Sequence, residues 1–156
     1  MKKIIQFIIC LLIPLAVGGL SGFATSKNIE SWHQYLTKPW FNPPNYLFGP
    51  VWTSLYLLMG ISFFIIVNKT ASEQRNKAII AFFIQLTLNF MWSFIFFQFH
   101  QIGLAFIEII LLWCAILWMM VQFYKVDKLA AYLNIPYLLW VSFASVLNFA
   151  IWNLNK

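Results

Sequence analysis

The sequence predicts an all-α integral membrane protein, a bundle of five transmembrane helices with a long, structured first loop. Of its 156 residues, 62% are hydrophobic and only 9% are charged, whereas a soluble domain is typically about 45–50% apolar and about 25% charged. Five apolar stretches of about 20 residues, the length that crosses about 30 Å of hydrocarbon, are separated by polar joints. We expect one domain over residues 1–156, with spans at about 4–24, 47–67, 78–99, 101–123 and 132–152.

The first span begins like a secretory signal peptide, since Lys2 and Lys3 precede an apolar stretch. No clear small-residue cleavage site follows, and the apolar character continues to Ala24, so we expect an uncleaved helix. Gly18 and Gly22 form a G-x-x-x-G pattern, which lets helices approach closely. The pattern serves packing within the chain or in a homodimer, and one copy does not decide between them.

The connection from residue 25 to residue 45 is the unusual loop, because the other three connections are short. Loops of this length in compact domains are usually functional or disordered. Aromatic residues favour order because they bury large areas, and prolines stiffen the chain by fixing φ. We expect a rigid aromatic cap over one end of the bundle, and a lid that serves packing alone is the alternative. The residues that predict the cap are Trp32, Tyr35, Trp40, Phe41, Tyr46, Pro39, Pro43, Pro44 and Pro50.

Three spans carry stripes of polar and aromatic side chains at helical spacing. Side chains that are three, four, seven or eleven residues apart share one face of a helix. In a membrane the helix satisfies its own backbone, so the remaining polar side chains carry the information about function. The stripes are Trp52, Tyr56, Gly60 and Phe63 in the second span, Gln85, Asn89, Trp92 and Phe96 in the third, and Trp140, Ala144, Asn148 and Ile151 in the fifth.

Two interpretations of these stripes are open. Asn89 and Asn148 could serve only as hydrogen bonds between helices, each worth about 0.6 kcal/mol on average. Alternatively, the stripes converge on a pocket with apolar walls, flat aromatic faces and a few N–H and O–H donors, with room beside Gly60 and Ala144. Such a pocket suits a large planar hydrophobic ligand. Three stripes of one chemical kind under an aromatic cap favour the pocket.

Glu108 in the fourth span is the only carboxylate at membrane depth. An ionisable group in a membrane is a functional candidate by default, because burying it unpaired is costly. No Lys, Arg or His within a span can pair with it, so we expect it to be protonated, near water, or facing a polar cavity. A structural and a functional role are equally open. Elsewhere in the bundle, Pro14 and Pro136 are expected to kink their helices.

The basic residues predict how the bundle is oriented. Seven of them lie on the N-terminal side of the five spans and three on the opposite side, and loops rich in Lys and Arg stay in the cytoplasm. We therefore expect the N-terminus in the cytoplasm, with the C-terminus and the first loop outside the cell membrane. The net charge of +6 forms no dense basic stripe, so nucleic acid is not an expected partner. The seven are Lys2, Lys3, Lys69, Arg75, Lys77, Lys125 and Lys128, and the three are Lys27, Lys38 and Lys156.

The sequence contains no conventional active-site motif. It has no glycine-rich phosphate loop, no nucleophile with a base and no pair of carboxylates, so it does not support a hydrolase or a kinase. Inverted repeats typical of secondary transporters are not evident. Cys10 and Cys114 lie within apolar spans and indicate neither a disulfide framework nor a zinc site. His33 and His100 are too isolated for a metal site, and axial ligation of haem iron by either is a minor alternative.

Several motifs together resemble one family, the tryptophan-rich sensory proteins, whose mitochondrial relatives are the translocator proteins or peripheral benzodiazepine receptors. The similarity covers essentially the whole chain in order and spacing. The motifs are Trp32-x-x-Tyr35-Leu36-x-Lys38-Pro39-x-x-x-Pro43-Pro44, Pro50-Val51-Trp52-x-x-Leu55-Tyr56-x-x-Met59-Gly60, Gln85-Leu86-x-Leu88-Asn89-x-x-Trp92-Ser93 with Phe96-Phe97, and Pro136-Tyr137-Leu138-x-Trp140-x-x-Phe143-Ala144-x-x-Leu147-Asn148.

This resemblance implies a five-helix bundle, commonly a homodimer, that binds tetrapyrroles such as protoporphyrin IX and haem as ligands rather than as tightly bound cofactors. It also implies binding of isoquinoline-carboxamide and benzodiazepine drugs in a pocket under the first loop. Bacterial members are associated with light- and oxygen-dependent breakdown of protoporphyrin IX. With Tyr56 from the second stripe, the residues carried over to the pocket are Trp32, Tyr35, Trp52, Asn89, Trp92, Trp140, Ala144, Leu147 and Asn148.

Within that pocket, Trp52 and Trp140 are the residues expected to take part in photochemistry. An excited porphyrin makes reactive oxygen or a radical, and an adjacent indole can be oxidised or pass an electron, so acid–base residues are not required. A transporter of porphyrins or other hydrophobic ligands, and a stress-linked sensor without turnover, are the alternatives. Mammalian members carry a cholesterol-recognition pattern near the end of the fifth helix, but here Phe149 and Asn153 replace its Tyr and its basic residue. Cholesterol binding is therefore doubtful.

Overall fold

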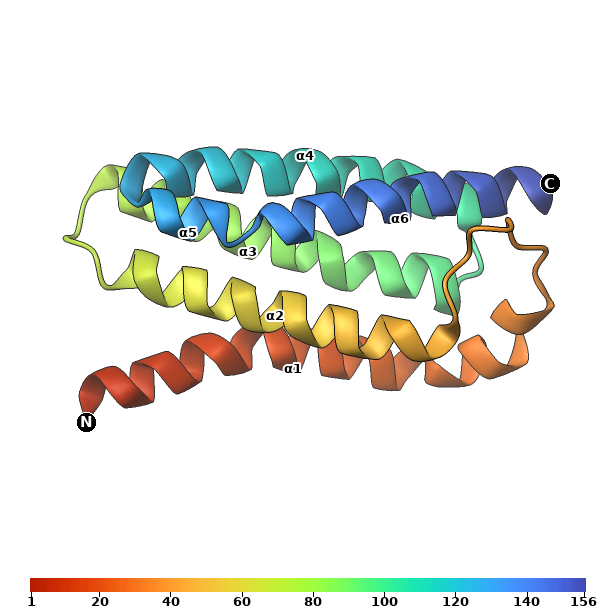
Figure 1. Ribbon diagram of the computed structural model, residues 1–156, viewed down its shortest axis with the longest axis horizontal. Helices are drawn as coiled ribbons and strands as arrows, with labels where there is room; N and C mark the ends of the chain where they lie inside the picture. The colour runs from red at the N-terminus through yellow and green to blue at the C-terminus, as the bar shows by residue number, and fades with distance from the viewer.

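The regular elements in the computed structural model, which describes residues 1–156, are all helices. Five helical segments are long and apolar enough to cross a membrane, which confirms the predicted all-α membrane bundle. The helices run along the long axis of the molecule, and the two termini lie at opposite ends (Figure 1). Five crossings therefore place the termini on opposite sides of the bilayer.

The helical spans extend beyond the predicted limits at most of their ends. The first four are α1 (Lys2–Ser31), α2 (Asn45–Val67), α3 (Glu73–Ser93) continued by the π-helix η2 (Phe94–Gln98), and α4 (Ile102–Val126). The fifth is divided into a short α5 (Lys128–Tyr132) and a longer α6 (Ile135–Leu154). Between α1 and α2 lies one 3₁₀ turn, η1 (His33–Tyr35).

Helix α1 shows the largest difference from the prediction, because it continues to Ser31 instead of ending near residue 24. Two hydroxyl groups beyond that point are satisfied within the helix. The Thr25 hydroxyl donates to the Ser21 carbonyl at 2.7 Å, and the Ser26 hydroxyl donates to the Phe23 carbonyl at 2.9 Å. The non-helical part of the first loop is therefore shorter than expected and begins at Trp32.

The fifth span is interrupted before Pro136 rather than kinked at it. Pro136 lies in the first turn of α6, where a backbone N–H has no partner within the helix. The break itself is held by Asn134, whose buried amide donates to the Ser62 hydroxyl and to the Ala130 carbonyl, both at 3.0 Å. This side chain ties α6 to α2 and takes up the freed backbone carbonyl of α5.

Helices α1 and α2 approach each other closely at Gly60. A Cβ atom on this glycine would lie 2.7 Å from the Leu11 Cα and 2.8 Å from the Cys10 carbonyl oxygen, which are backbone atoms that cannot move aside. Pro14, four residues after Cys10, has no N–H to donate to that same carbonyl. The proline thus frees the Cys10 carbonyl at the point where α2 approaches.

The glycine pattern of α1 contributes to packing within the chain through its first member. A Cβ atom on Gly18 would collide with the ring of Tyr56, whereas one on Gly22 would meet nothing within 4 Å. Gly18 therefore sets the distance between α1 and α2 beside Tyr56. Gly22 leaves open space beside the helix.

The bundle is densely packed in the half that contains the α2–α3 loop. Met59, Ile66 and Phe82 are fully buried there. The rings of Phe63 and Phe82 stack with their centroids 4.1 Å apart and their planes 9° from parallel. At the other end, beneath the first loop, the same helices enclose a cavity.

Candidate ligand-binding cavity

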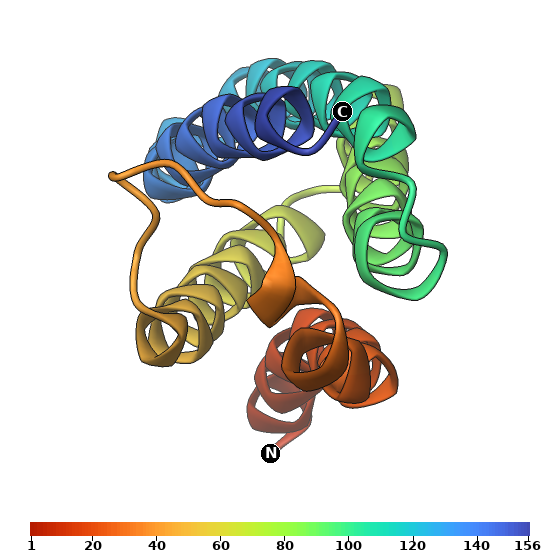
Figure 2. The ribbon, with the colours of Figure 1, turned by 90° about the vertical axis from the view of Figure 1, so that its right-hand side faces the viewer.

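A cavity of about 390 Å³ lies between α1, α2, α3, α4 and α6, in the half of the bundle nearest the first loop. The loop crosses this end of the bundle from α1 to α6 and returns to α2 (Figure 2). Asn42 of the loop and His33 of η1 contribute to the lining. The volume lies within the range of small-molecule sites, about 300–1,000 Å³.

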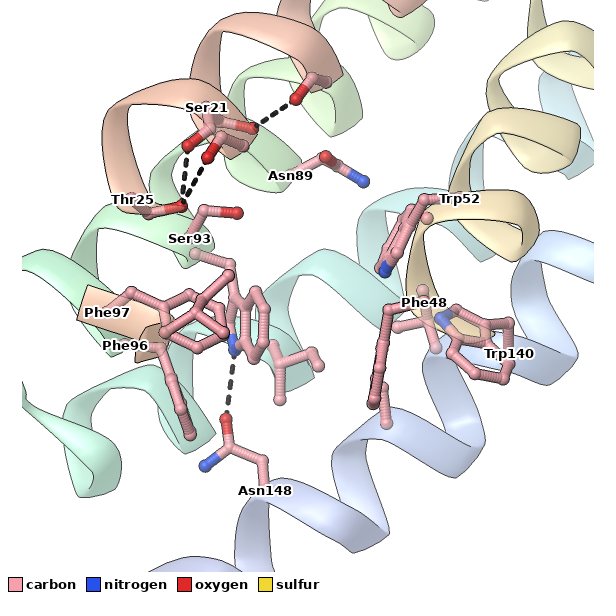
Figure 3. A pocket seen from close by; sticks show the side chains of 18 of the residues that line it. Ser21, Thr25, Phe48, Trp52, Asn89, Ser93, Phe96, Phe97, Trp140 and Asn148 are labelled. Carbon is pink, nitrogen blue, oxygen red and sulfur yellow. Dashed lines mark hydrogen bonds between the residues drawn. The ribbon is translucent and has the colours of Figure 1, made fainter. Parts of the chain in front are cut away.

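Small residues form the wall that α1 contributes. The hydroxyl of Ser21 donates to the Gly18 carbonyl at 3.1 Å, and that of Thr25 donates to the Ser21 carbonyl, as Figure 3 shows. These polar groups are therefore already satisfied by their own helix. Two large side chains, Leu15 and Ile29, also belong to this wall, and its other members are small. The small members are Gly18, Gly19, Ser21, Gly22 and Thr25.

Aromatic rings form two other walls. Phe48, Trp52 and Trp140 lie on one side of the cavity, and Phe96 and Phe97 lie on the other (Figure 3). The Phe48 and Trp140 rings meet edge to face with centroids 5.9 Å apart. Such rings present large flat apolar surfaces, which suit a planar hydrophobic ligand.

A chain of buried hydrogen bonds lies beside the deep end of the cavity. The Tyr56 hydroxyl donates to Asn89 Oδ1 at 2.7 Å, and Asn89 Nδ2 donates to the Tyr137 hydroxyl at 2.8 Å. The Tyr137 hydroxyl in turn donates to Gln85 Oε1 at 2.7 Å, and Gln85 Nε2 contacts Met59 Sδ at 3.8 Å. This chain joins α2, α3 and α6 where the packed half meets the hollow half.

The indoles that line the cavity differ in their hydrogen bonding. Trp92 Nε1 donates to Asn148 Oδ1 at 3.0 Å, and Asn148 Nδ2 donates to the Ile102 carbonyl at 3.0 Å. In contrast, Trp140 Nε1 is buried and has no partner. Asn89 and Asn148 therefore make the interhelical hydrogen bonds of the simpler interpretation while also lining a cavity, and the two interpretations hold together.

Eight of the ten predicted ligand-binding residues line the cavity, and two do not. Tyr35 is 79% exposed at the end of η1, and Trp32 stacks on His100 with the ring centroids 4.2 Å apart. Both residues flank His33, and at this point of the chain it is His33 that contributes to the lining instead. The eight that line it are Trp52, Tyr56, Asn89, Trp92, Trp140, Ala144, Leu147 and Asn148.

Many of the residues that the sequence analysis missed come from α1 and from the loop. The α1 wall has no polar stripe, and its only signal was the glycine pattern. His33 and Asn42 precede α2 in irregular segments, where no periodicity indicates direction. Tyr137 is the centre of the hydrogen-bond chain, and only its position in the resemblance motif drew attention to it.

The loop is fastened to the C-terminal end of α6 by a pair of reciprocal hydrogen bonds. The Thr37 N–H donates to Asn155 Oδ1 at 3.0 Å, and Asn155 Nδ2 donates to the Thr37 carbonyl at 2.8 Å. Phe41 adds an edge-to-face contact with Phe143 of α6, with ring centroids 6.3 Å apart. We call the Thr37–Asn155 pair the latch.

Glu108 does not face the cavity. Its side chain is buried, and neither carboxyl oxygen has a hydrogen-bond partner. The next residue in the sequence, Ile109, lines the cavity instead, and so does Leu112. The sequence-based alternative in which Glu108 faces a polar cavity is therefore wrong for this cavity.

Two ionisable groups outside the spans have a pKa that is lowered from its ordinary value. Burial, together with the positive charge of Lys38, lowers the pKa of His33 from 6.5 to about 4. At the other end of the bundle, a 2.7 Å bond from Lys69 lowers the pKa of Asp127, which also caps α5 by accepting from the Ala130 N–H. His33 is therefore neutral at neutral pH, and Asp127 is ionised.

Fold and cavity together define a multi-pass membrane protein with an aromatic-walled ligand cavity under its first loop. The chain matches the model of the TspO/MBR family over residues 10–153. It is 42% identical to the tryptophan-rich protein TspO of Archaeoglobus fulgidus over 98% of this chain and 99% of that protein. It is 39% identical to the protein of the same name from Chlorobaculum tepidum, over 99% and 98% of the two chains. The translocator protein of Homo sapiens is 37% identical over 80% of this chain and 75% of its own length.

The chain therefore belongs to the TspO/MBR family, and the predicted family resemblance is confirmed. Its relatives include proteins named tryptophan-rich sensory protein and translocator protein. Membership supports a role in binding tetrapyrroles or other hydrophobic ligands within the membrane.

Proposed function

We propose that the cavity binds tetrapyrroles, protoporphyrin IX foremost, and that the protein promotes their light- and oxygen-dependent degradation. The observation that carries this proposal is the aromatic-walled cavity itself, with Phe48, Trp52 and Trp140 on one side and Phe96 and Phe97 on the other. Flat apolar rings bind best between such surfaces. The small residues of the α1 wall leave room for the breadth of a macrocycle.

The polar groups of the site support the same ligand class. Trp140 Nε1 is a buried donor without a partner, and buried polar groups in proteins are normally hydrogen-bonded. This atom has almost no accessible surface, so an acceptor on the ligand would reach it only after the indole turns. No ionised side chain lines the cavity, so the binding energy would come from burial and stacking.

Light supplies the chemistry in this proposal, and the protein holds the ring beside oxygen. The excited porphyrin passes its energy to oxygen, and singlet oxygen adds across a methine bond, which cleaves into two carbonyl groups. One oxygen atom ends on each carbon, so no external reductant is consumed. Trp52 and Trp140 can also act as electron donors. An indole then loses one electron through the ring to oxygen, which becomes superoxide, and its N–H proton passes to the medium.

Light-dependent turnover by the purified protein tests this function. We expect protoporphyrin absorbance to fall in light and oxygen but not in darkness, and to fall much more slowly with Trp52→Phe or Trp140→Phe. Trp118→Phe is the matched control, because Trp118 lies on the exposed face of α4. Porphyrin loss that is equal in wild type, the double variant and the control would contradict the role of the two indoles.

A second candidate function, movement of ligands across the membrane, is favoured by the name translocator protein that the Sus scrofa and Homo sapiens relatives carry. It requires a route through the packed half, where Met59, Ile66 and Phe82 are fully buried. Protein-dependent flux of porphyrin into sealed vesicles in darkness is the measurement that would support it. No flux at several ligand concentrations would leave binding and degradation as the function.

The remaining expectations from the resemblance belong to the same proposal. The cavity would also take isoquinoline-carboxamide and benzodiazepine ligands, which are hydrophobic and planar in part. A stress-linked sensor that binds without turnover is distinguished from the degradation function by the light experiment. We further propose that the protein forms a homodimer, as the family resemblance implies. We also propose that its N-terminus lies in the cytoplasm and its first loop and C-terminus lie outside, an orientation that the distribution of Lys and Arg supports.

A further inference from the structure

His33 is the one histidine at the cavity, and its environment is unusual for a polar side chain. It begins η1 directly after α1, is only 7% exposed, and contributes to the cavity lining. Its ring meets the edge of Phe97 with centroids 5.4 Å apart and lies 6.0 Å from Phe96. Its Nδ1 atom is buried and has no hydrogen-bond partner.

An unpartnered nitrogen calls for an explanation, because buried polar atoms are normally satisfied. Nδ1 is closed off from the cavity, whereas Nε2 is not among the buried atoms and makes no hydrogen bond, so Nε2 is the nitrogen open to a ligand. Burial and the nearby Lys38 charge lower the pKa of His33 to about 4. The imidazole is therefore neutral at neutral pH, which is the form that binds metals. No carboxylate lines the cavity to hold the ring as a cation instead.

His100, the other histidine, is in a different situation. It is exposed, it stacks on Trp32, and its Nε2 lies 3.3 Å from Asn28 Oδ1. It does not line the cavity. The sequence could not separate the two histidines, and the structure places only His33 at the cavity.

We propose that His33 is the axial ligand of the iron when the cavity holds haem, an inference that rests on the proposed tetrapyrrole binding. Iron, when bound in the porphyrin, supplies a Lewis-acidic centre that commonly takes a histidine nitrogen as its axial ligand. The residues present fit this group: a neutral buried imidazole, aromatic walls for the macrocycle, and no competing thiol, since Cys10 and Cys114 lie outside the lining. His33 would thus make the site discriminate between iron-bearing and metal-free tetrapyrroles.

The experiment compares ferric haem with metal-free protoporphyrin IX on the purified full-length protein. Wild type, His33→Ala and the matched control His100→Ala are titrated with each tetrapyrrole in the dark, and the absorption and electron paramagnetic resonance spectra of the haem complexes are recorded. We expect His33→Ala to weaken haem binding by about tenfold or more, which corresponds to about 1.4 kcal/mol. Its haem spectrum should lose the signature of histidine ligation, and protoporphyrin binding should stay unchanged.

Two additional measurements keep the inference testable if His33→Ala is poorly folded. Added imidazole should restore the wild-type haem spectrum in His33→Ala, because it replaces the missing ligand. In the wild-type protein, resonance Raman spectra of ferrous haem should show an iron–histidine stretch that shifts when histidine is labelled with ¹⁵N.

The outcomes separate this inference from the function on which it rests. If neither tetrapyrrole binds to the wild type, the proposed function is overturned, and the role of His33 with it. If both bind, but the haem spectra of wild type and His33→Ala are the same, tetrapyrrole binding stands and the role of His33 is overturned. Loss of the histidine signature in His100→Ala instead would likewise contradict the assignment.

Discussion

The two halves of the bundle are built from the same helices but have opposite interiors. In the half with the α2–α3 loop, large side chains such as Phe63 and Phe82 fill the centre and stack at 4.1 Å. In the half under the first loop, α1 contributes glycine, serine and threonine, and a cavity of about 390 Å³ remains. Both halves are apolar, so the sizes of the inward side chains determine which end is hollow.

The boundary between the halves is polar. The chain Tyr56–Asn89–Tyr137–Gln85 runs across three helices at the level where the large side chains end. A satisfied buried network specifies one arrangement of its helices more sharply than apolar contacts do. We infer that this network keeps the packed half from closing over the hollow one. Substitutions in each half and at their boundary test this division.

Overpacking the contact between α1 and α2 should have the largest effect on stability. In Gly60→Leu the new side chain meets the backbone of Cys10 and Leu11, which cannot move aside, so we expect a loss of about 3 kcal/mol. Thermal unfolding in detergent measures this loss. Gly49→Ala on the same helix is the control, since a Cβ there meets nothing within 4 Å. Equal melting temperatures for the two variants would contradict the close approach.

Removing the central amide of the polar boundary should come next. Asn89→Ala leaves the buried Tyr56 hydroxyl without its acceptor, which we expect to cost about 1–3 kcal/mol. The melting temperature should fall, and ligand affinity should fall with it because the deep end of the cavity loosens. Asn76→Ala is the matched control on α3, because Asn76 is exposed. A network without structural importance would leave both variants equally stable.

Opening the latch should change ligand kinetics more than stability. Asn155→Ala removes both hydrogen bonds to Thr37, each worth about 0.5–1.5 kcal/mol. We therefore expect protoporphyrin IX to dissociate up to about tenfold faster. Stopped-flow quenching of tryptophan fluorescence measures this rate. Association of protoporphyrin IX should accelerate too, with a smaller change in Kd. Asn153→Ala, an exposed neighbour on α6, is the control. Unchanged rates in Asn155→Ala would show that the loop does not govern access.

The hollow half should be sensitive to mild acid through His33. Its pKa is lowered from 6.5 to about 4, so between these values the unfolded chain binds a proton that the folded chain does not. Stability should therefore decline as the pH falls from 6.5 to 4. Melting temperatures measured across that range should decline less in His33→Phe than in wild type, and His100→Ala should follow the wild type. Identical profiles for all three would contradict the burial of a neutral His33.

The stability that Asp127 contributes at the packed end should change only at pH values below the ordinary pKa range of an aspartate. Lys69 lowers the pKa of Asp127, so its contribution is present at neutral pH and is lost as the pH falls through the lowered value. The pair is partly exposed, and we expect Asp127→Asn to cost less than about 1 kcal/mol at pH 7. The difference in melting temperature between wild type and Asp127→Asn should vanish in strong acid. A difference in melting temperature that persists in strong acid would have to come from the helix cap alone.

The sequence predicted the five spans because length and apolarity are local properties that a membrane enforces along each helix. It failed at the end of α1, where Thr25 and Ser26 are polar by composition but donate to their own helix. Composition assigned them to a loop. The sequence also predicted a kink at Pro136 where the helix is instead broken at Asn134. The reason is that the bond from Asn134 to Ser62 joins residues 72 positions apart.

The stripes predicted seven of the eight ligand-binding residues that line the cavity, because helical periodicity aligns side chains that point the same way, and Leu147 came from the family resemblance. Periodicity does not extend into η1 and the loop, and the family resemblance placed Trp32 and Tyr35 in a cavity that they do not line. The sequence offered His33 only as a minor alternative for haem ligation. The α1 wall was hidden for another reason. It is defined by side chains that are missing, and a glycine signals close packing and open space equally well.

That wall also determines how close a bound ligand comes to lipid. On its outer side α1 presents exposed apolar residues, among them Leu20 and Phe23 at 64% and 84% exposure, and on its inner side it presents small residues flanked by Leu15 and Ile29. The cavity and the acyl chains are therefore separated by the thickness of one helix. A hydrophobic molecule already dissolved in the bilayer lies nearer to this site than one in water, and the membrane becomes its reservoir.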